Sequence, residues 1–385
     1  MSGSWHLITG EYPPQRGGVS DYTATLARAL ADAGCSVHVW TPSGAESSTA
    51  GVTVHQLPDV FGALGLRVLD AGLDAVPAPR VVLVQYVPQA FGARGMNVSF
   101  CRWVERRGRT PGDDLRVMFH EPYYPFVAWP PHRNLLALAN RFMATLLMAA
   151  ARTAYVSTTA WAGRLRRYAP ASLSFVWLPV PSSIPALRDT GAVVAMRRLL
   201  APDASTRVVG HFGTYGTLNT ALLVPALRAL LARRADVRIC LLGTGSDAMA
   251  AELVARDPSH RGRIIGTGHQ APAELAACLQ ACDVALQPYT DGASGRRTTL
   301  MAALANGVAV VGNRGPATEA VWAEDDAVVL VPRATPGELA DAVAALLDDD
   351  TKRTLTASRG RALYDRCFSI EHTVKVLLAP TGSRT

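Results

Sequence analysis

Short apolar runs alternate with amphipathic, helix-like stretches along this 385-residue chain. A short apolar run, a helix and another apolar run are typical of βαβ units, whose strands pair in parallel and are covered by helices on both faces. Such strands are buried on both sides, so they do not show the apolar–polar alternation of half-exposed strands. This pattern constrains the fold more than any other feature, and it predicts an α/β protein.

The alternation occurs twice. In the first half we expect strands at Trp5–Thr9, Ser36–Thr41, Val52–Leu57, Val81–Tyr86, Leu115–His120, Thr153–Ser157 and Ser172–Leu178, with helices that include Ser20–Ala33 and Asn134–Ala150. In the second half we expect strands at Arg207–His211, Asp236–Leu242, Arg263–Gly266, Val284–Pro288, Val308–Val311 and Ala327–Val331, and helices at Leu218–Arg234, Asp247–Ala255, Pro272–Ala281, Thr298–Ala305 and Pro336–Asp348. Both halves therefore look like doubly wound sheets.

The proline-rich segment Leu178–Pro185 separates the halves. Three prolines within it exclude a continuous helix and suit a linker. Because compact domains usually have about 100–200 residues, we expect two of them, at residues 1–180 and 186–366. Residues 367–385 would form a final helix that returns to the first domain.

Composition excludes several classes of protein. The net charge is +7, but no basic–aromatic module is present, so a nucleic-acid partner is not expected. The six cysteines are scattered without a CxxC pair, which favours core packing over metal binding. The N-terminus does not look like a signal peptide, and Asn140 and Arg141 interrupt the apolar stretch Leu135–Ala151. We expect a soluble, cytoplasmic protein, with peripheral contact between its first domain and the inner face of the membrane left open.

Ligands of doubly wound sheets bind beyond the carboxyl ends of the strands, which directs attention to the loops there. The first expected strand leads to Gly17 and Gly18 just before a helix, with Ser20 or Asp21 as its cap. Paired glycines at a helix start can approach a phosphate, although a tight turn explains them as well. His120 ends another strand and is expected to point into the cleft, as a hydrogen-bond donor or base or simply as a partly buried histidine.

Two loops of the second half are informative. Asp291–Leu300 combines small residues, hydroxyls and two arginines at a helix start, which suits a diphosphate, although an exposed loop is the plain alternative. Gly243–Ser246 and Gly266–His269 each follow a strand. Together these two turns could shape a nucleobase pocket, and alone they mean little more than tight turns.

Taken together, these segments resemble the retaining glycosyltransferases of the GT-B fold, family 4, also called glycosyl transferases group 1. The resemblance covers nearly the whole chain and rests on order and spacing: Glu11–Tyr22, Val156–Trp161, Leu178–Pro181, Leu242–Gly245, Glu274–Asp283, Leu286–Tyr289 and Leu300–Val311. It implies two Rossmann-like domains facing each other across a cleft. It also implies transfer of a sugar from a UDP- or GDP-sugar to a glycan, lipid-linked or natural-product acceptor, with retention and without a metal or a cofactor beyond the nucleotide-sugar.

The resemblance also implies roles for individual residues. His120 would contact the donor sugar near the reacting carbon, and Gly17 and Gly18 would approach the diphosphate. The remaining donor-binding candidates are Gly213, Thr214, Gly243, Gly266, Ser294, Gly295, Arg296, Arg297, Thr298 and Glu319, of which Glu319 could instead cap the helix that follows it. The acceptor would meet aromatic residues of the first domain, Tyr86, Tyr123 and Tyr124, whereas Arg102, Arg106, Arg107 and Arg109 could meet a phosphate or lipid headgroup.

Two departures distinguish this chain from its relatives. The family's two glutamates, eight positions apart, are replaced by Ser294 and Ala302, and the usual Arg and Lys are absent from Gly210–Gly216. Arg296 and Arg297, or Arg16, could supply the missing positive charge. These losses keep two alternatives open: a non-catalytic relative that binds nucleotide-sugar, and another enzyme on the same fold, such as a sugar-nucleotide epimerase.

Overall fold

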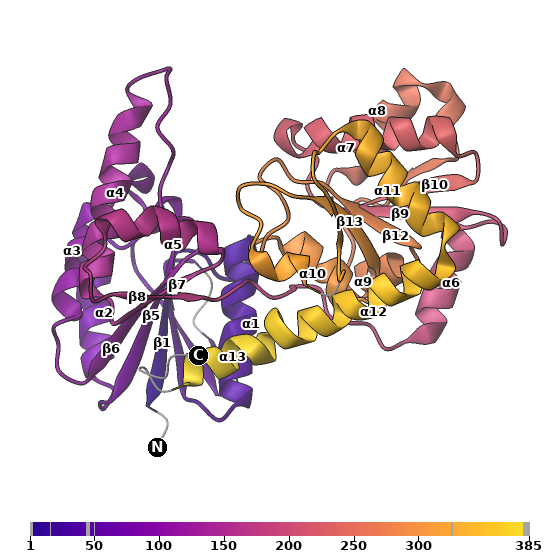
Figure 1. Ribbon diagram of the computed structural model, residues 1–385. Helices are drawn as coiled ribbons and strands as arrows, with labels where there is room; N and C mark the ends of the chain where they lie inside the picture. Colours follow the sequence, from indigo (N-terminus) through magenta and orange to yellow (C-terminus); the bar gives the residue numbers. More distant parts are fainter. Residues whose placement is uncertain (1–2, 16, 44–46, 50, 325, 380–385) are drawn as a thin grey trace. The chain divides into compact units, whose positions relative to one another are not determined.

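The computed structural model describes residues 3–15, 17–43, 47–49, 51–324 and 326–379 (Figure 1). The chain forms two compact units: Met1–Pro179 together with Thr373–Thr385, and Val180–His372. Each unit contains a parallel sheet with its own hydrophobic core. The predicted fold class, two Rossmann-like α/β domains, is confirmed.

The sheet of the first unit has the strand order β3-β4-β2-β1-β5-β6-β7-β8. Its strands are β1 (Ser4–Thr9), β2 (Val37–Thr41), β3 (Ser47–Thr49), β4 (Val52–Gln56), β5 (Arg80–Tyr86), β6 (Asp113–Phe119), β7 (Thr153–Val156) and β8 (Ser174–Trp177). The pairing is parallel except at the edge, where β3 runs antiparallel to β4. The long central strands pair β1 with β5 and β5 with β6 without a break in register.

The helices of the first unit are α1 (Gly18–Asp32), α2 (Ala63–Asp74), α3 (Val98–Arg107), α4 (Arg133–Ala150), α5 (Thr159–Leu165) and α13 (Ile370–Leu378, from Thr373 onward), with short 3₁₀ turns η1 (Pro88–Phe91), η2 (Ala93–Gly95) and η3 (Arg166–Tyr168). Tyr22, Leu26 and Leu30 are spaced four residues apart on α1 and are fully buried, as expected for a helix that packs on a sheet. Helix α13 is fastened to the sheet by Arg116, whose Nη1 donates to the carbonyl of Leu377 at 2.6 Å.

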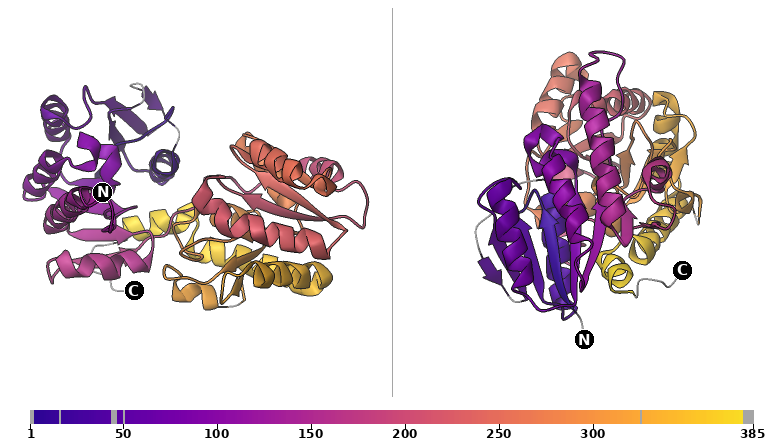
Figure 2. Two further views of the ribbon diagram at one scale, coloured as in Figure 1. Left: turned by 90° about the horizontal axis from the view of Figure 1, so that it is seen from above. Right: turned by 90° about the vertical axis from the view of Figure 1, so that its left-hand side faces the viewer.

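The sheet of the second unit has the order β11-β10-β9-β12-β13-β14, and the pairs between its described strands are parallel. Its strands are β9 (Arg207–Phe212), β10 (Val237–Leu242), β11 (Ile264–Gly266), β12 (Val284–Gln287), β13 (Ala309–Asn313) and β14 (Val329–Val331). Its helices are α6 (Thr190–Leu200), α7 (Thr217–Arg233), α8 (Ser246–Arg256), α9 (Pro272–Gln280), α10 (Thr298–Ala305), α11 (Pro336–Asp348) and α12 (Asp350–Cys367), with 3₁₀ turns η4 (Pro258–His260) and η5 (Ala320–Ala323). Figure 2 shows helices on both faces of this sheet.

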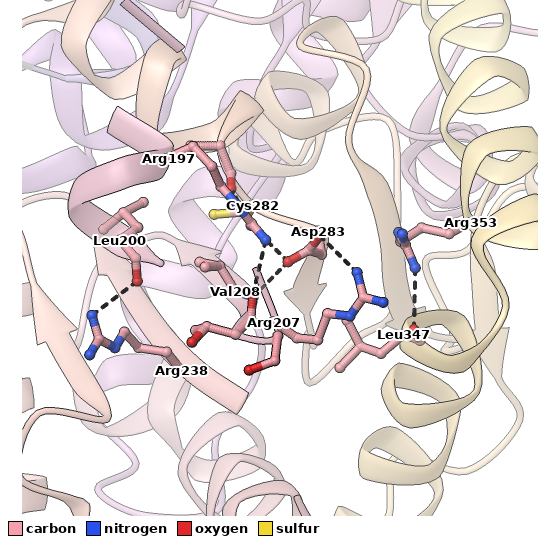
Figure 3. Close-up of polar contacts among 12 residues, drawn as sticks. Arg197, Leu200, Arg207, Val208, Arg238, Cys282, Asp283, Leu347 and Arg353 are labelled. Carbon is pink, nitrogen blue, oxygen red and sulfur yellow. Dashed lines mark hydrogen bonds and ion pairs between the residues drawn. The ribbon is translucent and has the colours of Figure 1, made fainter. Parts of the chain in front are cut away.

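Arginines hold the amino-terminal edge of the second sheet together (Figure 3). The Oδ2 atom of Asp283, just before β12, accepts from Arg197 Nη1 and from the backbone of Val208, both at 2.7 Å. Arg197 also donates to the carbonyls of Ala281 and Thr206, so helix α6 is tied to two strand starts at once. This cluster lies at the end of the strands opposite to the loops where ligands are expected.

A similar network lies at the amino-terminal edge of the first sheet. The fully buried carboxylate of Asp113 bonds to Arg80 and to Arg107, each at 2.6 Å, and Arg107 also reaches Asp74 at 2.8 Å. The expectation that Arg107 meets a ligand phosphate or headgroup is therefore wrong, because its charge is used inside the fold. Arg109, which is exposed, pairs with Glu105 at 2.8 Å.

Among the described helices, none combines the length and the apolar character needed to cross a bilayer.

Candidate functional site

In the first unit, Gly17 and Gly18 lie where strand β1 gives way to α1. Gly17 is the N-cap and has extended backbone, and no side chain caps the helix. The expected caps are therefore wrong: Ser20 lies inside α1 and donates its hydroxyl to the carbonyl of Gln15 at 2.6 Å. A Cβ atom on Gly17 would lie 2.5 Å from Oε2 of Glu11, whereas one on Gly18 would meet nothing within 4 Å. Gly17 thus permits close packing on Glu11, and Gly18 leaves open space at the helix start. Arg16 lies outside the described residues.

His120 follows β6 and is almost completely buried, 9% exposed. Its Nε2 pairs with Oε1 of Gln85 at 2.8 Å, and its ring meets the edge of Tyr22 with 4.9 Å between centroids. Burial lowers the pKa of His120 to about 3. The structure corrects the expectation that the His120 side chain points away from the core: its ring is buried and bonded to Gln85, as in the alternative of a partly buried histidine. It is a neutral imidazole at physiological pH, and its Nε2 proton is donated to Gln85.

The three acceptor-side tyrosines have different environments. Tyr86 ends β5 and is fully buried in the core, packed edge-on against Phe119. It offers no surface to an acceptor, so this prediction is wrong. Tyr123 is half-buried and donates its hydroxyl to the carbonyl of Arg164 at 3.3 Å, while Tyr124 is 42% exposed.

In the second unit, the loop between β12 and α10 carries the largest group of predicted donor-binding residues. Asp291 forms ion pairs with both arginines of this loop, with Nη2 of Arg296 at 2.8 Å and with Nη2 of Arg297. Burial alone would raise the pKa of Asp291, but the charges of Arg297 and Arg296 outweigh burial and hold this pKa below its ordinary value. Arg297 also lies over the ring of Tyr289, 4.6 Å from its centroid. The net charge of Asp291, Arg296 and Arg297 together is +1, whereas the two arginines alone would give +2.

Gly295 is held on both sides of its backbone. Its N–H donates to Glu319, and its carbonyl accepts from the N–H of Val180 at 2.8 Å. Glu319 is buried and also accepts from the indole of Trp322 at 2.7 Å. The N–H of Gly295 is therefore occupied by an internal carboxylate, and Glu319 fixes the loop from its position before η5.

Ser294 and Thr298 flank the arginines. The hydroxyl of Ser294 is fully buried and has no hydrogen-bond partner among the described residues. Thr298 is the first residue of α10, where backbone N–H groups lack intrahelical acceptors. The next residue, Thr299, bonds through its hydroxyl to that of Tyr289 at 2.8 Å. A helix start, a buried hydroxyl and two arginines thus lie within one short loop.

The remaining glycine candidates lie in tight, mutually packed turns. Gly243 has a φ of +100°, and a Cβ there would lie 2.8 Å from the carbonyl oxygen of Gly213. A Cβ on Gly266 would lie 2.2 Å from the carbonyl oxygen of Ser246. Thr214 accepts from Asn219 at 2.7 Å through its hydroxyl. These contacts are enough to explain the glycines by packing, so they do not by themselves indicate a nucleobase pocket.

Within the described ranges, no group of three or more His, Cys, Asp or Glu side chains could hold a metal ion.

Sequence reasoning missed Asp291 and Gln85 as partners of the candidate residues. Asp291 lies five and six positions before the two arginines, and in the sequence it looks like an ordinary loop residue. Gln85 is 35 residues from His120, and the contact arises because β5 and β6 are neighbours in the sheet. The pair of Gln85 and His120 could have been predicted only from the expectation that their two strands are parallel neighbours in the sheet.

Comparison with known proteins supports the expected family. Residues 206–349 match the family described as glycosyl transferases group 1. The chain is 27% identical over 359 residues to phosphatidyl-myo-inositol mannosyltransferase of Mycolicibacterium smegmatis, covering 88% of this chain and 83% of the relative. Its fold is similar to that of sucrose-phosphate synthase from Thermosynechococcus elongatus, with TM-score 0.71, 17% identity and 97% of both chains covered. It is also similar to Anabaena HepE solved with UDP and glucose, with TM-score 0.69, 16% identity, and 99% and 100% of the chains covered.

Proposed function

We propose that this chain is a group 1 glycosyltransferase that transfers a hexose from a UDP- or GDP-sugar to a glycan, lipid-linked or natural-product acceptor, with retention of the anomeric configuration and without a metal ion; the family match over residues 206–349, the mannosyltransferase relative and the GT-B fold support it. The donor class follows from the family, since members of this group use nucleotide-sugars. The retention, the metal independence and the acceptor classes rest on the resemblance to family 4, and the candidate residues bear on how the donor is held.

The loop that joins β12 to α10 carries this proposal. Its backbone is fixed by Glu319 and Val180, and it presents the start of a helix beside Arg296 and Arg297. A leaving diphosphate gains negative charge as the glycosidic bond breaks, and preorganised cations and helix N-termini stabilise that charge. A guanidinium has five N–H donors, so Arg297 can keep its pair with Asp291 and still bond to a phosphate oxygen.

Ser294 would contact the donor sugar. Its hydroxyl is fully buried and has no hydrogen-bond partner among the described residues, so contact with the sugar requires a local shift that exposes it; it could then both donate to and accept from a sugar hydroxyl. It stands where relatives carry a glutamate, and a neutral hydroxyl makes a weaker hydrogen bond than a carboxylate does. We therefore expect looser recognition of the sugar than in a relative with the acidic pair.

In the first unit, His120 would act on the donor sugar as a neutral hydrogen-bonding group. Its low pKa excludes an imidazolium at neutral pH, and the proton on Nε2 would have to be shared between Gln85 and the sugar. Gly18 would leave room for the diphosphate at the start of α1.

The first test is a thermal-shift screen with UDP, GDP, ADP and CMP, followed by transfer assays with sugars of the stabilising base. A bound nucleotide raises the melting temperature by mass action, so a diphosphate of one base should give a saturable shift and its monophosphate a smaller one. Activity that survives EDTA would support metal independence. NMR of the product would give the anomeric configuration, and inversion would overturn the retaining mechanism.

The second candidate function is a catalytically inactive protein that binds nucleotide-sugar. Ser294 and Ala302 replace the family's glutamates, and Asp291 offsets part of the positive charge, which favours binding without turnover. Saturable nucleotide binding without product from a panel of donors and acceptors would support this candidate over the transferase.

A further inference from the structure

The segment that leads into α4, together with the outer face of α4, exposes six large apolar side chains. Trp129 is 82% exposed and Leu135 is 66% exposed, and the other members of this exposed apolar surface are Tyr124, Phe126, Leu138 and Phe142. Folded proteins rarely expose so many large apolar side chains close together unless they bind something there.

The spacing of these residues places them on one face of the helix. Leu135, Leu138 and Phe142 follow each other at intervals of three and four residues, so they form a stripe along α4. The residues of α4 that pack into the core, among them Ala144 and Leu147, lie on the opposite face. Helix α4 therefore has two apolar faces, one of which packs into the core of the first unit.

The aromatic part of the surface is held in place rather than loosely attached. Arg141 lies over the rings of Tyr123 and Phe126, with 4.2 and 4.0 Å to their centroids, and donates to the carbonyl of Tyr124. Asn134 makes two hydrogen bonds with the backbone of Val127, one in each direction and both of 2.9 Å. The side chains of Arg141 and Asn134 therefore hold this aromatic segment in a fixed position at the surface.

Positive charge predominates in the sequence that carries this surface, although the exposed Glu121 lies just before it. From Pro122 to Arg188 the sequence contains no acidic residue and seven arginines, at positions 133, 141, 152, 164, 166, 167 and 188. Arg133 is exposed at the start of α4, and Arg164 and Arg167 are exposed beside Tyr123, whose hydroxyl bonds to the carbonyl of Arg164. Apolar side chains flanked by cations, with tryptophan among them, match the headgroup region of a membrane that carries anionic lipids.

We propose that this exposed apolar surface docks the first unit onto the headgroup layer of an anionic bilayer. Trp129, Phe126 and the leucines enter the boundary between headgroups and acyl chains, while Arg133, Arg164 and Arg167 meet lipid phosphates. The interaction does not depend on sugar transfer, so it is tested separately from the proposed activity.

The experiment is flotation of the full chain with vesicles of phosphatidylcholine alone or mixed with phosphatidylglycerol. The wild type should float with the anionic vesicles, and less so as salt rises. The triple variant Trp129→Ser, Leu135→Ser, Leu138→Ser should lose about tenfold or more in the bound fraction. A control with the equally exposed leucines of the second unit, Leu199→Ser, Leu218→Ser and Leu355→Ser, should bind as the wild type does.

Because the substituted side chains are exposed, both triple variants should unfold at the wild-type temperature, which separates loss of binding from loss of fold. Failure of the wild type to float with anionic vesicles, or equal flotation of the first variant and the wild type, would overturn the proposal. A third outcome would also overturn it. If the wild type does not float but forms a dimer in sedimentation equilibrium without vesicles, and the first variant abolishes that dimer, the surface joins two copies of the chain.

Discussion

The backbone N–H of Gly295 points between both carboxylate oxygens of Glu319, at 3.2 and 3.1 Å, although the two residues are 24 positions apart. A buried carboxylate that accepts from a backbone amide and from the indole of Trp322 fixes the loop before α10. The candidate donor loop is thus shaped before any ligand arrives, and removing its anchor should be measurable.

Replacing Glu319 by Ala should lower the free energy of unfolding by about 2–4 kcal/mol, because two buried donors lose their acceptor at about 1–3 kcal/mol each. Glu319→Gln keeps one acceptor oxygen and should cost less. Urea denaturation measures both. The exposed Glu252, paired with Arg256, provides the control, and Glu252→Ala should change stability by less than about 0.5 kcal/mol. An E319A protein as stable as the wild type would show that the hydrogen bonds of Glu319 do not stabilise the fold.

Replacing Arg296 and Arg297 together by Ala should weaken nucleoside diphosphate binding about 10–100-fold in calorimetry, since charge-assisted hydrogen bonds contribute about 1.5–3 kcal/mol. The double variant leaves Asp291 unpaired beside the ligand. Adding Asp291→Asn removes that repulsion, and affinity should stay low if the arginines themselves bind the phosphates. Arg233→Ala is the control because it removes an arginine of the same unit that pairs with Asp341 on the surface. Unchanged affinity in the double variant would reject the role of the arginines.

His120→Ala should retain nucleotide binding but lower kcat by about 10²-fold, the usual cost of one lost hydrogen-bond donor to the reacting group. Since the pKa of His120 is held near 3 by burial, protonation of this residue should not change the transfer rate between pH 5.5 and 8. Wild-type turnover in H120A, or a pH profile whose acid limb near pH 6.5 disappears in that variant, would contradict a neutral donor.

Acid should destabilise the fold before most carboxylates titrate. Burial lowers the pKa of His6 and His120 to about 3 and that of His211 to about 4, against about 6.5 in an unfolded chain. The unfolded chain therefore binds more protons between these values. The stabilising contribution is complete above about pH 6.5 and is lost as pH falls toward 4, at up to about 1.4 kcal/mol per pH unit for each histidine.

Urea denaturation at pH 7 and pH 5.5 measures this loss. His211→Asn should reduce the pH dependence by about a third, and His132→Gln, which changes an exposed histidine, should leave it unchanged. Equal stability of the wild type at both pH values would contradict the assignment of three buried neutral histidines.

Most of the strand positions were predictable because parallel strands that are buried on both faces stand out as apolar runs. The predicted strand at Val284–Pro288 and the predicted helix at Thr298–Ala305 lie within one residue of the observed elements. Elements with few apolar residues were missed. Helix α12 is polar along most of its length, and the short strand β3 contains only serine and threonine.

The site was less predictable because its geometry depends on contacts that are distant in the sequence. The loop before α10 was found from its composition, but its anchoring by Glu319 and the pairing of both arginines with Asp291 were not. Tyr86 was misassigned for a related reason: a tyrosine at the end of a strand can face either the ligand or the core, and here the ring packs against Phe119.

The most direct measurement is release of nucleoside diphosphate from a panel of UDP- and GDP-sugars, incubated with acceptor fractions and either the wild type or the Arg296→Ala, Arg297→Ala variant. We expect the wild type to release one diphosphate together with a glycosylated product, and the double variant to release at least about tenfold less. Saturable nucleotide binding by the wild type without release from any donor would contradict a transferase and leave a protein that only binds its nucleotide-sugar.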